Sequence, residues 1–289
     1  MQMLLQVLVS GIAMGFIYSL VGYEFTLIWN AASLINFAHD KFIMISAYIF
    51  AGTFVIGLGT NPIVAVIITL IIMGVFGALV AVGIFNPLRN MPSDLYAVTG
   101  TLLLARILAE LTRLIWGPVP FTIQNFITGV VHIGGIVIPQ INIAIIVVSV
   151  VFLIFLQLLF KKTKIGKAMR CVSQDKTASS LMGINVQRYI IFTIALSTMI
   201  CTVIGILIIP TFMVTTDMGS MIGLKGFAAS VVGGFGILPG NIVGGMTVGI
   251  LENLSILVLP AIYKDVVAFV LLILFLLIRP NGILGKRKD

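Results

Sequence analysis

Long runs of apolar residues, separated by short polar or glycine-containing segments, follow one another along the whole chain. The runs cover residues 4–28, 42–58, 63–85, 95–115, 141–160, 189–210, 241–259 and 265–279. At about 1.5 Å per helical residue, most of them are long enough to cross about 30 Å of hydrocarbon. They are continuously apolar and do not alternate, which excludes the strands of a membrane β-barrel. The pattern therefore predicts an all-α polytopic membrane protein, with residues 1–289 as a single transmembrane domain.

Two segments interrupt this pattern, one in each half of the chain. Polar residues break it at 30–41, and glycines break it at 217–240. Broken helices of this kind bring backbone dipoles to the middle of a bilayer. The second segment can either cross fully or turn back. We therefore expect about eight to nine transmembrane or re-entrant helices in two pseudo-repeated halves, with one broken helix in each.

Composition supports a lipid environment. The chain has 289 residues, of which 60% are hydrophobic and 9% charged, and its mean hydropathy is +1.22. So few charges cannot cover a water-soluble globule. The formal net charge of +8 does not indicate nucleic acid, because the basic residues cluster beside the apolar runs.

These basic clusters predict the orientation of the chain. Two segments hold most of them, namely Lys161, Lys162, Lys164, Lys167, Arg170, Lys176 and Arg188 in one loop and Arg279, Lys286, Arg287 and Lys288 in the tail. Positively charged loops stay in the cytoplasm, so we expect the loop 161–188 and the C-terminus to be cytoplasmic. The segment 86–94 then lies on the same side, and the loop 116–140 lies outside.

The loop 161–188 also contains a predicted short helix at 173–183. Ser173 is the expected N-cap, Asp175 lies in the first turn, and Gly183 is expected to end the helix. One side of this helix is apolar and the other is polar; the apolar residues are Ala178, Leu181 and Met182, and the polar ones include Gln174 and Lys176. Periodicity alone leaves two interpretations open: a contact surface, or a positively charged loop that happens to be helical.

The chain lacks the residues of a catalytic site or a nucleotide site. It has two histidines, with no spacing to carboxylates that would form a catalytic set. The glycine-rich stretch GGFGILPGN has neither the lysine nor the hydroxyl residue of a phosphate-binding P-loop. The two cysteines do not indicate a metal site or a disulfide. We therefore expect a non-catalytic chain that binds no cofactor or metal itself.

Three stretches, in this order, resemble one protein family. Near the start stands GIAMGFIYSLVGYEFTLIWNAASLINFAHDKFIMISAY, then KKTKIGKAMRCVSQDKTASSLMGINVQRYIIFTIALS, and near the end GLKGFAASVVGGFGILPGNIVGGMTVGILENL with YKDVVAFVLLILFLLIRPNGILG. The middle stretch resembles the conserved cytoplasmic loop of permease subunits of branched-chain amino acid ABC importers. The resemblance covers nearly the entire chain.

The resemblance implies a set of partners. It implies two ATP-binding-cassette ATPase subunits that hold ATP and Mg, a second permease subunit that is homologous or identical, and an extracytoplasmic solute-binding protein. It also implies a multi-pass protein in the cytoplasmic (inner) membrane of a prokaryote. The helix at 173–183 would be the coupling helix that inserts into a cleft on an ATPase. The residues expected to form this contact are Ser173, Gln174, Asp175, Lys176, Ala178, Leu181, Met182 and Gly183.

Polar residues inside the apolar runs are candidates for a translocation path. Asn36 and His39 either line this path or satisfy backbone groups freed at the helix break, and Asp40 follows them directly. Glu24 has no oppositely charged residue at helical spacing, so it is a candidate for contacting the solute or for pairing with Lys41 or Lys225. Lys225 is accordingly included in the predicted path.

Other polar and small residues are expected to hold helices together. Gly236, Gly240 and Gly244 are spaced by four, which allows close helix packing, and Glu252 is interpreted as a polar contact between helices. Arg106, Glu110 and Arg113 share one helical face and predict a ladder of ion pairs.

Two alternative functions stay open at this level. One is the same machinery carrying another small solute, such as urea or a short amide. The other is a channel or ion-coupled carrier that works without ATPases.

Overall fold

The structure is a computed structural model that describes residues 2–89, 91–123, 127, 129–133 and 136–285. Seven helices in these ranges are long and apolar enough to cross a membrane: Gln2–Ala32, His39–Gly57, Pro62–Arg89, Leu95–Trp116, Gln140–Lys162, Val186–Ile208 and Leu238–Leu257. The predicted all-α polytopic membrane fold is confirmed. Lys286, Arg287 and Lys288 of the predicted cytoplasmic tail lie outside the described residues.

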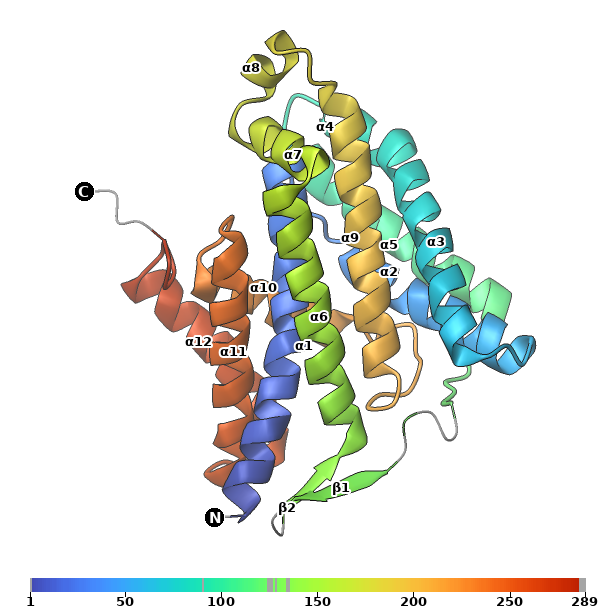
Figure 1. Cartoon of the computed structure of the whole chain (residues 1–289), viewed down its shortest axis with the longest axis vertical. Coiled ribbons are helices and arrows are strands. Elements are labelled where there is room, and N and C mark those ends of the chain that lie inside the picture. The colour runs from blue at the N-terminus through green and yellow to red at the C-terminus, as the bar shows by residue number, and fades with distance from the viewer. Residues whose placement is uncertain (1, 90, 124–126, 128, 134–135, 286–289) are drawn as a thin grey trace. The chain divides into compact units, whose positions relative to one another are not determined.

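The elements follow one another in an almost entirely helical order (Figure 1). The α-helices are α1 (Gln2–Ala32), α2 (His39–Ala47), α3 (Pro62–Val80), α4 (Asn86–Arg89), α5 (Asp94–Trp116), α6 (Gln140–Lys162), α7 (Lys164–Gln174), α8 (Lys176–Leu181), α9 (Val186–Ile208), α10 (Ser220–Gly233), α11 (Leu238–Leu254) and α12 (Lys264–Ile278). The π-helical segments Tyr48–Gly57 and Ala81–Phe85 continue α2 and α3, and short 3-10 turns cover Ser255–Leu257 and Ala261–Tyr263. The strands are β1 (Val130–Ile133) and β2 (Ile136–Pro139).

The chain forms two compact units that interleave in the sequence. Unit 1 consists of Met1–Thr26, Gln124–Phe152 and Met221–Asp289, and unit 2 of Leu27–Ile123 and Leu153–Ser220. The helices α1, α6 and α10 each contribute residues to both units, with only Ser220 of α10 in unit 2. Each unit is described below by itself.

In unit 2, the buried helix α9 packs against α2 and α3. Small residues bring these helices close together. A Cβ atom at Gly77 of α3 would overlap the side chain of Thr198, and one at Gly205 of α9 would overlap Ser46 and Ile43 of α2. The Thr198 hydroxyl also donates to the backbone oxygen of Met73 at 2.8 Å. Close approach and hydrogen bonding of this kind hold helices together where lipid offers no hydrophobic driving force.

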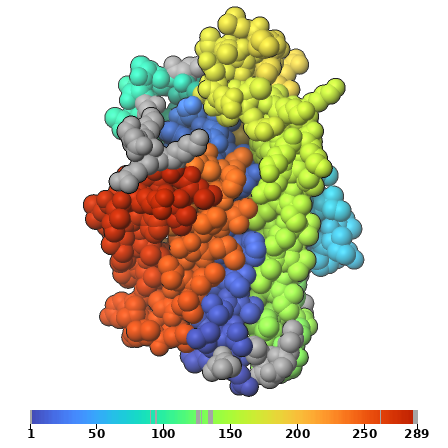
Figure 2. Space-filling view, turned by 60° about the vertical axis from the view of Figure 1, so that its left-hand side comes forward, coloured from blue at the N-terminus to red at the C-terminus, as the bar shows by residue number. Residues whose placement is uncertain are grey.

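In unit 1, glycines hold α11 against α1 and α10. Gly15 of α1 lies against the backbone of Gly245 and Gly249 in α11, so that the two helices meet without intervening side chains. Gly240 and Gly244 lie against the last turns of α10, where a Cβ atom at Gly244 would overlap the backbone of Ala229. Figure 2 shows α12 (red) lying alongside α11 (orange) in the same unit.

Gly236 lies in a turn and not in a helix, so the prediction of helix packing at an even spacing of four does not hold for it. It lies before α11, in the turn that follows α10, and has φ +87°. This left-handed backbone conformation suits glycine because it has no Cβ atom. The spacing of four residues therefore reflects a turn requirement at the first glycine and helix packing at the other two.

Both predicted helix breaks are present. The first separates α1 from α2 between Ala32 and His39. The second separates α10 from α11, so residues 217–240 form no single crossing. The 14 residues of α10 extend about 21 Å, which is shorter than the hydrocarbon core of about 30 Å. Of the predicted runs, 265–279 likewise corresponds to a short helix, α12.

The loop 116–140 contains a small hairpin that the apolar pattern did not predict. Strands β1 and β2 pair antiparallel, with Val130 opposite Pro139 and His132 opposite Val137. In Figure 1 the hairpin lies near the N-terminal end of α1, within unit 1.

Candidate functional site

The first helix break places polar groups inside unit 2. Asn36 is fully buried, and its Oδ1 accepts a hydrogen bond from the backbone N–H of Ala38 at 2.9 Å. His39 begins α2, with its Nδ1 3.3 Å from the backbone oxygen of Asn36. The Asn36 Nδ2 is buried and has no hydrogen-bond partner among the described residues. Asn36 thus supports the backbone of the break and still offers an unused donor.

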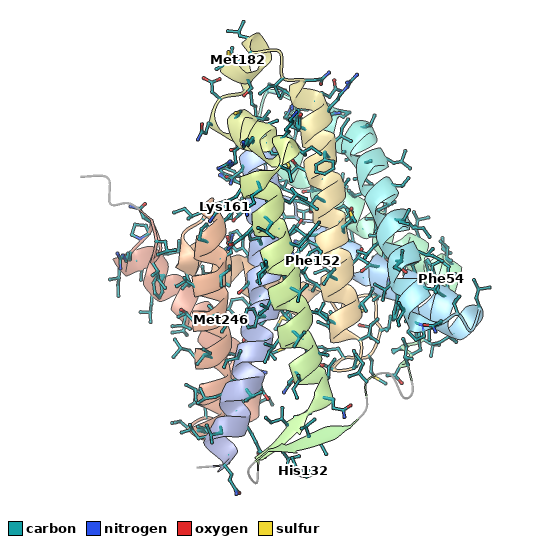
Figure 3. All side chains as sticks on the ribbon, in the orientation of Figure 1. Phe54, His132, Phe152, Lys161, Met182 and Met246 are labelled. Atoms are coloured by element: carbon teal, nitrogen blue, oxygen red, sulfur yellow. The ribbon has the colours of Figure 1, made fainter. Side chains whose placement is uncertain are left out.

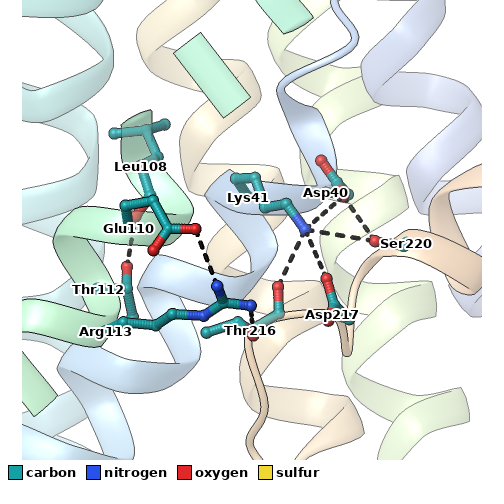
Figure 4. Close-up of polar contacts among 9 residues, drawn as sticks. All are labelled: Asp40, Lys41, Leu108, Glu110, Thr112, Arg113, Thr216, Asp217 and Ser220. Atoms are coloured by element: carbon teal, nitrogen blue, oxygen red, sulfur yellow. Dashed lines mark hydrogen bonds and ion pairs between the residues drawn. The ribbon is translucent and has the colours of Figure 1, made fainter. Parts of the chain in front are cut away.

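Directly after the break, Lys41 collects polar groups from a distant segment (Figure 4). Its Nζ lies 3.1 Å from Asp40 Oδ2 and 3.3 Å from Asp217 Oδ1. It also donates to the backbone oxygen of Thr216 at 3.0 Å and to Ser220 Oγ at 3.4 Å. The Ser220 hydroxyl in turn donates to Asp40 Oδ2 at 2.8 Å. We call these five residues the Lys41 cluster.

The Lys41 cluster joins the two segments that interrupt the apolar pattern. Asp40 and Lys41 lie in the first turn of α2, and Ser220 is the first residue of α10. Gly219 permits the approach, because a Cβ atom there would overlap the backbone oxygen of Asp40. One lysine and two aspartates give the cluster a formal charge of −1. Lys41 is 8% exposed, whereas the side chain of Asp217 is 76% exposed, so the cluster has a buried side and an open side.

An ion pair from α5 extends the Lys41 cluster. Arg113 Nη1 lies 2.8 Å from Glu110 Oε1, and Arg113 Nη2 donates to the Thr216 hydroxyl at 3.4 Å. The predicted ladder is only partly right, since no ion pair joins Arg106 to Glu110 among the described residues. Arg106 is exposed.

A second buried lysine lies in unit 1. Lys225 Nζ is 2.8 Å from Glu252 Oε1 and 2.5 Å from Asp265 Oδ1. Lys264 Nζ approaches the same Glu252 oxygen at 3.5 Å. These contacts join α10, α11 and α12. Glu252 and Asp265 are therefore carboxylates that pair with Lys225, and the pairing of Glu24 with Lys41 or Lys225 considered from the sequence stays a prediction.

The five residues predicted for a translocation path thus fall into two groups. Asn36, His39 and Asp40 come together at the break in unit 2. Glu24, which is fully buried in α1, and Lys225 belong to unit 1.

The basic loop folds into two helices, and the predicted N-cap is wrong. Ser173 lies near the end of α7, where its hydroxyl donates to the backbone oxygen of Arg170 at 2.8 Å. Asp175 is the N-cap of α8, because its Oδ1 accepts from the backbone N–H groups of Thr177 at 2.8 Å and Ala178 at 2.9 Å. A carboxylate satisfies these free donors and also meets the positive end of the helix dipole.

The end of α8 follows the sequence prediction. Gly183 has φ +79°, and its backbone N–H donates to Ser180. The N–H of Ile184 donates to the carbonyl of Ser179, which completes a glycine-terminated helix end. Asn185 then caps α9 by accepting from the N–H of Arg188 at 3.1 Å.

Two large apolar side chains are uncovered at this end of α8. Leu181 and Met182 are each 83% exposed, and Figure 3 shows Met182 pointing away from the protein. On the other side, Lys176 donates to the hydroxyl of Ser33 at 2.9 Å, just after the end of α1. The segment therefore offers an uncovered apolar tip and contacts the first helix break at its base.

Comparison with known proteins shows which protein family this chain belongs to. The family model described as "Branched-chain amino acid transport system / permease component" matches residues 7–276. The chain belongs to this family. As a permease of this family with seven membrane-spanning candidates in the part of the chain that the structure describes, it is a multi-pass inner-membrane protein.

Individual relatives match over nearly the whole permease. It is 32% identical to the high-affinity branched-chain amino acid transport system permease protein BraD of Pseudomonas aeruginosa, over 98% of this chain and 96% of that protein. It is 30% identical to the corresponding permease protein LivH of Escherichia coli (strain K12), with the same coverage. Among solved structures, PsaBC from Streptococcus pneumoniae in complex with Fab gives a TM-score of 0.53 at 13% identity, covering 97% of this chain and 93% of that chain. That likeness concerns the fold alone.

Proposed function

We propose that this chain is the membrane permease of an ABC importer that moves branched-chain amino acids, driven by partner ATPases. The observation that carries the proposal is the form of α8. Its caps at Asp175 and Gly183 are local, whereas Leu181 and Met182 are turned outwards and uncovered. Exposed apolar side chains on a structured polar loop are typical of a protein contact.

The proposed assembly contains two ATP-binding-cassette ATPases, a second permease subunit and an extracytoplasmic solute-binding protein. ATP and Mg bind to the ATPases, and this chain binds no cofactor. The segments 86–94 and 161–188 and the C-terminus face the cytoplasm, with the hairpin loop outside. The relatives over nearly the full length of the chain, both named as permeases of branched-chain amino acid transport systems, support the permease role in this assembly.

The break between α1 and α2 is the part of the proposed translocation path that unit 2 contributes. Asn36 has an unused buried donor, and the Lys41 cluster has a formal charge of −1 with Asp217 exposed. Such a cluster favours a positively charged group, and the ammonium group of an amino acid is one. Glu24 and Lys225 are the residues that we propose for the path in unit 1.

Coupling through α8 is tested by replacing its uncovered tip. The double variant Leu181→Ser, Met182→Ser removes apolar surface without disturbing either cap. We expect ATP-driven uptake of leucine and co-purification of the ATPases to fall strongly, while the amount of permease in the membrane stays unchanged. Val119→Ser is the matched control, because Val119 is 72% exposed in a loop far along the chain from α8.

Two results would contradict the proposal. One is unchanged ATP-driven uptake by the double variant. The other is leucine transport by the purified permease in vesicles that contain no ATPase, which would indicate a channel or an ion-coupled carrier. The preference for amines is tested separately, because Asp217→Asn is expected to reduce uptake of leucine more than uptake of a short amide.

A further inference from the structure

A small pocket in unit 2 lies where the end of α1, the segment around α4 and the start of α8 meet. Its volume is about 160 Å³. The lining residues are Ala32, Ser33, Leu34, Leu88, Arg89, Met91, Ser93, Ala97 and Lys176. It is separate from the Lys41 cluster, with which it shares no residue.

Among the described residues, the two charged side chains that line this pocket are both positive. Arg89 comes from the end of α4 and Lys176 from the first turn of α8, and both are only partly exposed. Lys176 donates to the Ser33 hydroxyl at 2.9 Å, which leaves the hydroxyl hydrogen of Ser33 available for an acceptor. The Ser93 oxygen accepts from the backbone N–H of Leu95 at 3.3 Å, so its hydrogen is available as well.

Arg89 has a buried donor that no described residue uses. Its Nη1 is buried and has no hydrogen-bond partner among the described residues. Burying a charged donor without a partner is unfavourable. The pKa of Lys176 is lowered by burial and, second, by the positive charge of Arg89. Both observations describe a site where two positive charges lie close together and a buried donor has no acceptor among the described residues.

We propose that this pocket binds a small oxyanion, either phosphate or a carboxylate with no ammonium group beside it. Such a group would accept from Arg89, Lys176 and the two serine hydroxyls, and it would neutralise two cations at once. A zwitterionic amino acid is a poor ligand here, because its ammonium group would approach the same cations. The site is therefore distinct from the proposed transport path and does not depend on it.

Binding has a structural consequence for α8. Arg89 and Lys176 belong to segments that are far apart in the sequence, and an oxyanion between them would bridge the two. The bridge would also strengthen the contact of Lys176 with Ser33 at the end of α1. The oxyanion thus stabilises the arrangement in which the base of α8 is attached to the first helix break.

The test uses the full chain, purified in detergent. Inorganic phosphate, acetate and leucine are each titrated at constant ionic strength against chloride, and the midpoint of thermal unfolding is recorded. We expect phosphate or acetate to raise the midpoint in a saturable manner and leucine to have no effect. A response to phosphate alone identifies a phosphate ligand, and a response to acetate alone identifies a carboxylate.

Substitutions test whether the change in the unfolding midpoint comes from binding in this pocket. Arg89→Gln and Lys176→Gln are expected to weaken binding about tenfold or more, the usual cost of losing a hydrogen bond to a charged group. Lys176→Arg keeps the charge and should bind. Lys161→Gln is the matched control, because it removes one exposed lysine outside the pocket. Equal responses in Arg89→Gln and Lys161→Gln would overturn the proposal.

A second measurement does not depend on the folding of any variant. Phosphate or acetate should protect Lys176 of the natural protein, but not Lys161, from an amine-acylating reagent, as read by mass spectrometry. Absence of saturable binding by either anion overturns the proposal. Protection of Lys176 only in the complex with the ATPases also overturns it, since the acceptor would then be a carboxylate of the partner protein.

Discussion

The ion pair between Lys225 and Glu252 allows a quantitative test of the packing in unit 1. The Lys225 side chain is 7% exposed, and the Glu252 side chain is fully buried. Substitution Lys225→Met keeps most of the aliphatic length of the side chain and removes the ammonium group. The carboxylate of Glu252 then loses its partner at 2.8 Å. Asp265 also loses a partner, but its side chain is 45% exposed and can be hydrated.

The size of the expected loss in stability follows from the burial of the Glu252 carboxylate. Breaking a buried ion pair by removing one partner costs about 3–5 kcal/mol, because the remaining charge stays buried. Lys264 remains 3.5 Å from Glu252 Oε1 and compensates in part, so we expect a loss of about 3 kcal/mol for Lys225→Met. The double variant Lys225→Met, Glu252→Leu leaves no buried charge at this position. Its stability should therefore lie close to that of the natural protein.

The assay is a double-mutant cycle of reversible unfolding in detergent, with leucine uptake measured on the same four proteins. The natural protein, the two single variants and the double variant give a coupling energy. A coupling below about 0.5 kcal/mol would show that the two sites are independent and would refute the reasoning. Uptake separates two roles: recovery in the double variant indicates packing, whereas persistent loss with restored stability indicates that Lys225 belongs to the path.

Three further predictions compare matched substitutions. Asp175→Ala removes the cap of α8 and should reduce uptake at a cost of about 1 kcal/mol in local stability, whereas Ser173→Ala should have little effect. Gly183→Ala imposes a left-handed conformation on a residue with a Cβ atom, a cost of about 1–2 kcal/mol, and should reduce uptake more than Gly183→Asn. Gly244→Ala introduces a clash with the backbone of α10 and should lower the unfolding midpoint of the purified chain, whereas Gly83→Ala meets open space and should not. Equal effects within any of these pairs would contradict the corresponding contact.

The membrane fold could be predicted from the sequence because lipid leaves few alternatives. An apolar run must satisfy its own backbone, so its length and continuity are enough to indicate a helix. The two breaks were visible for the same reason, since polar or glycine residues interrupt the runs. The hairpin β1–β2 was not predicted because it has only four residues in each strand and most of them, apart from His132, are as apolar as those of the spans.

The polar contacts between helices were harder to predict, because they join residues far apart in the chain. The sequence did not predict Asp217 and Ser220 as site residues, although they lie beside Lys41, which is 176 and 179 positions away. Asp265 was missed as a partner of Lys225 in the same way. A lysine in an apolar run indicates that a carboxylate lies nearby, because a buried charge needs a partner. The sequence alone does not identify which carboxylate it is.

The shape of the small helix α8 is set by residues close to it in the sequence, whereas one of its contacts involves a residue far away in the sequence. Six residues are too few for a helix to be stable alone. Asp175 satisfies its first backbone donors and Gly183 closes its end, so both caps lie within the same short stretch of chain. Besides packing against α7 and α9, the helix is attached through a contact of Lys176 with Ser33, 143 positions away. A segment whose shape is set by its own caps keeps that shape when its surroundings move, which is what transmission of a force from a partner protein requires.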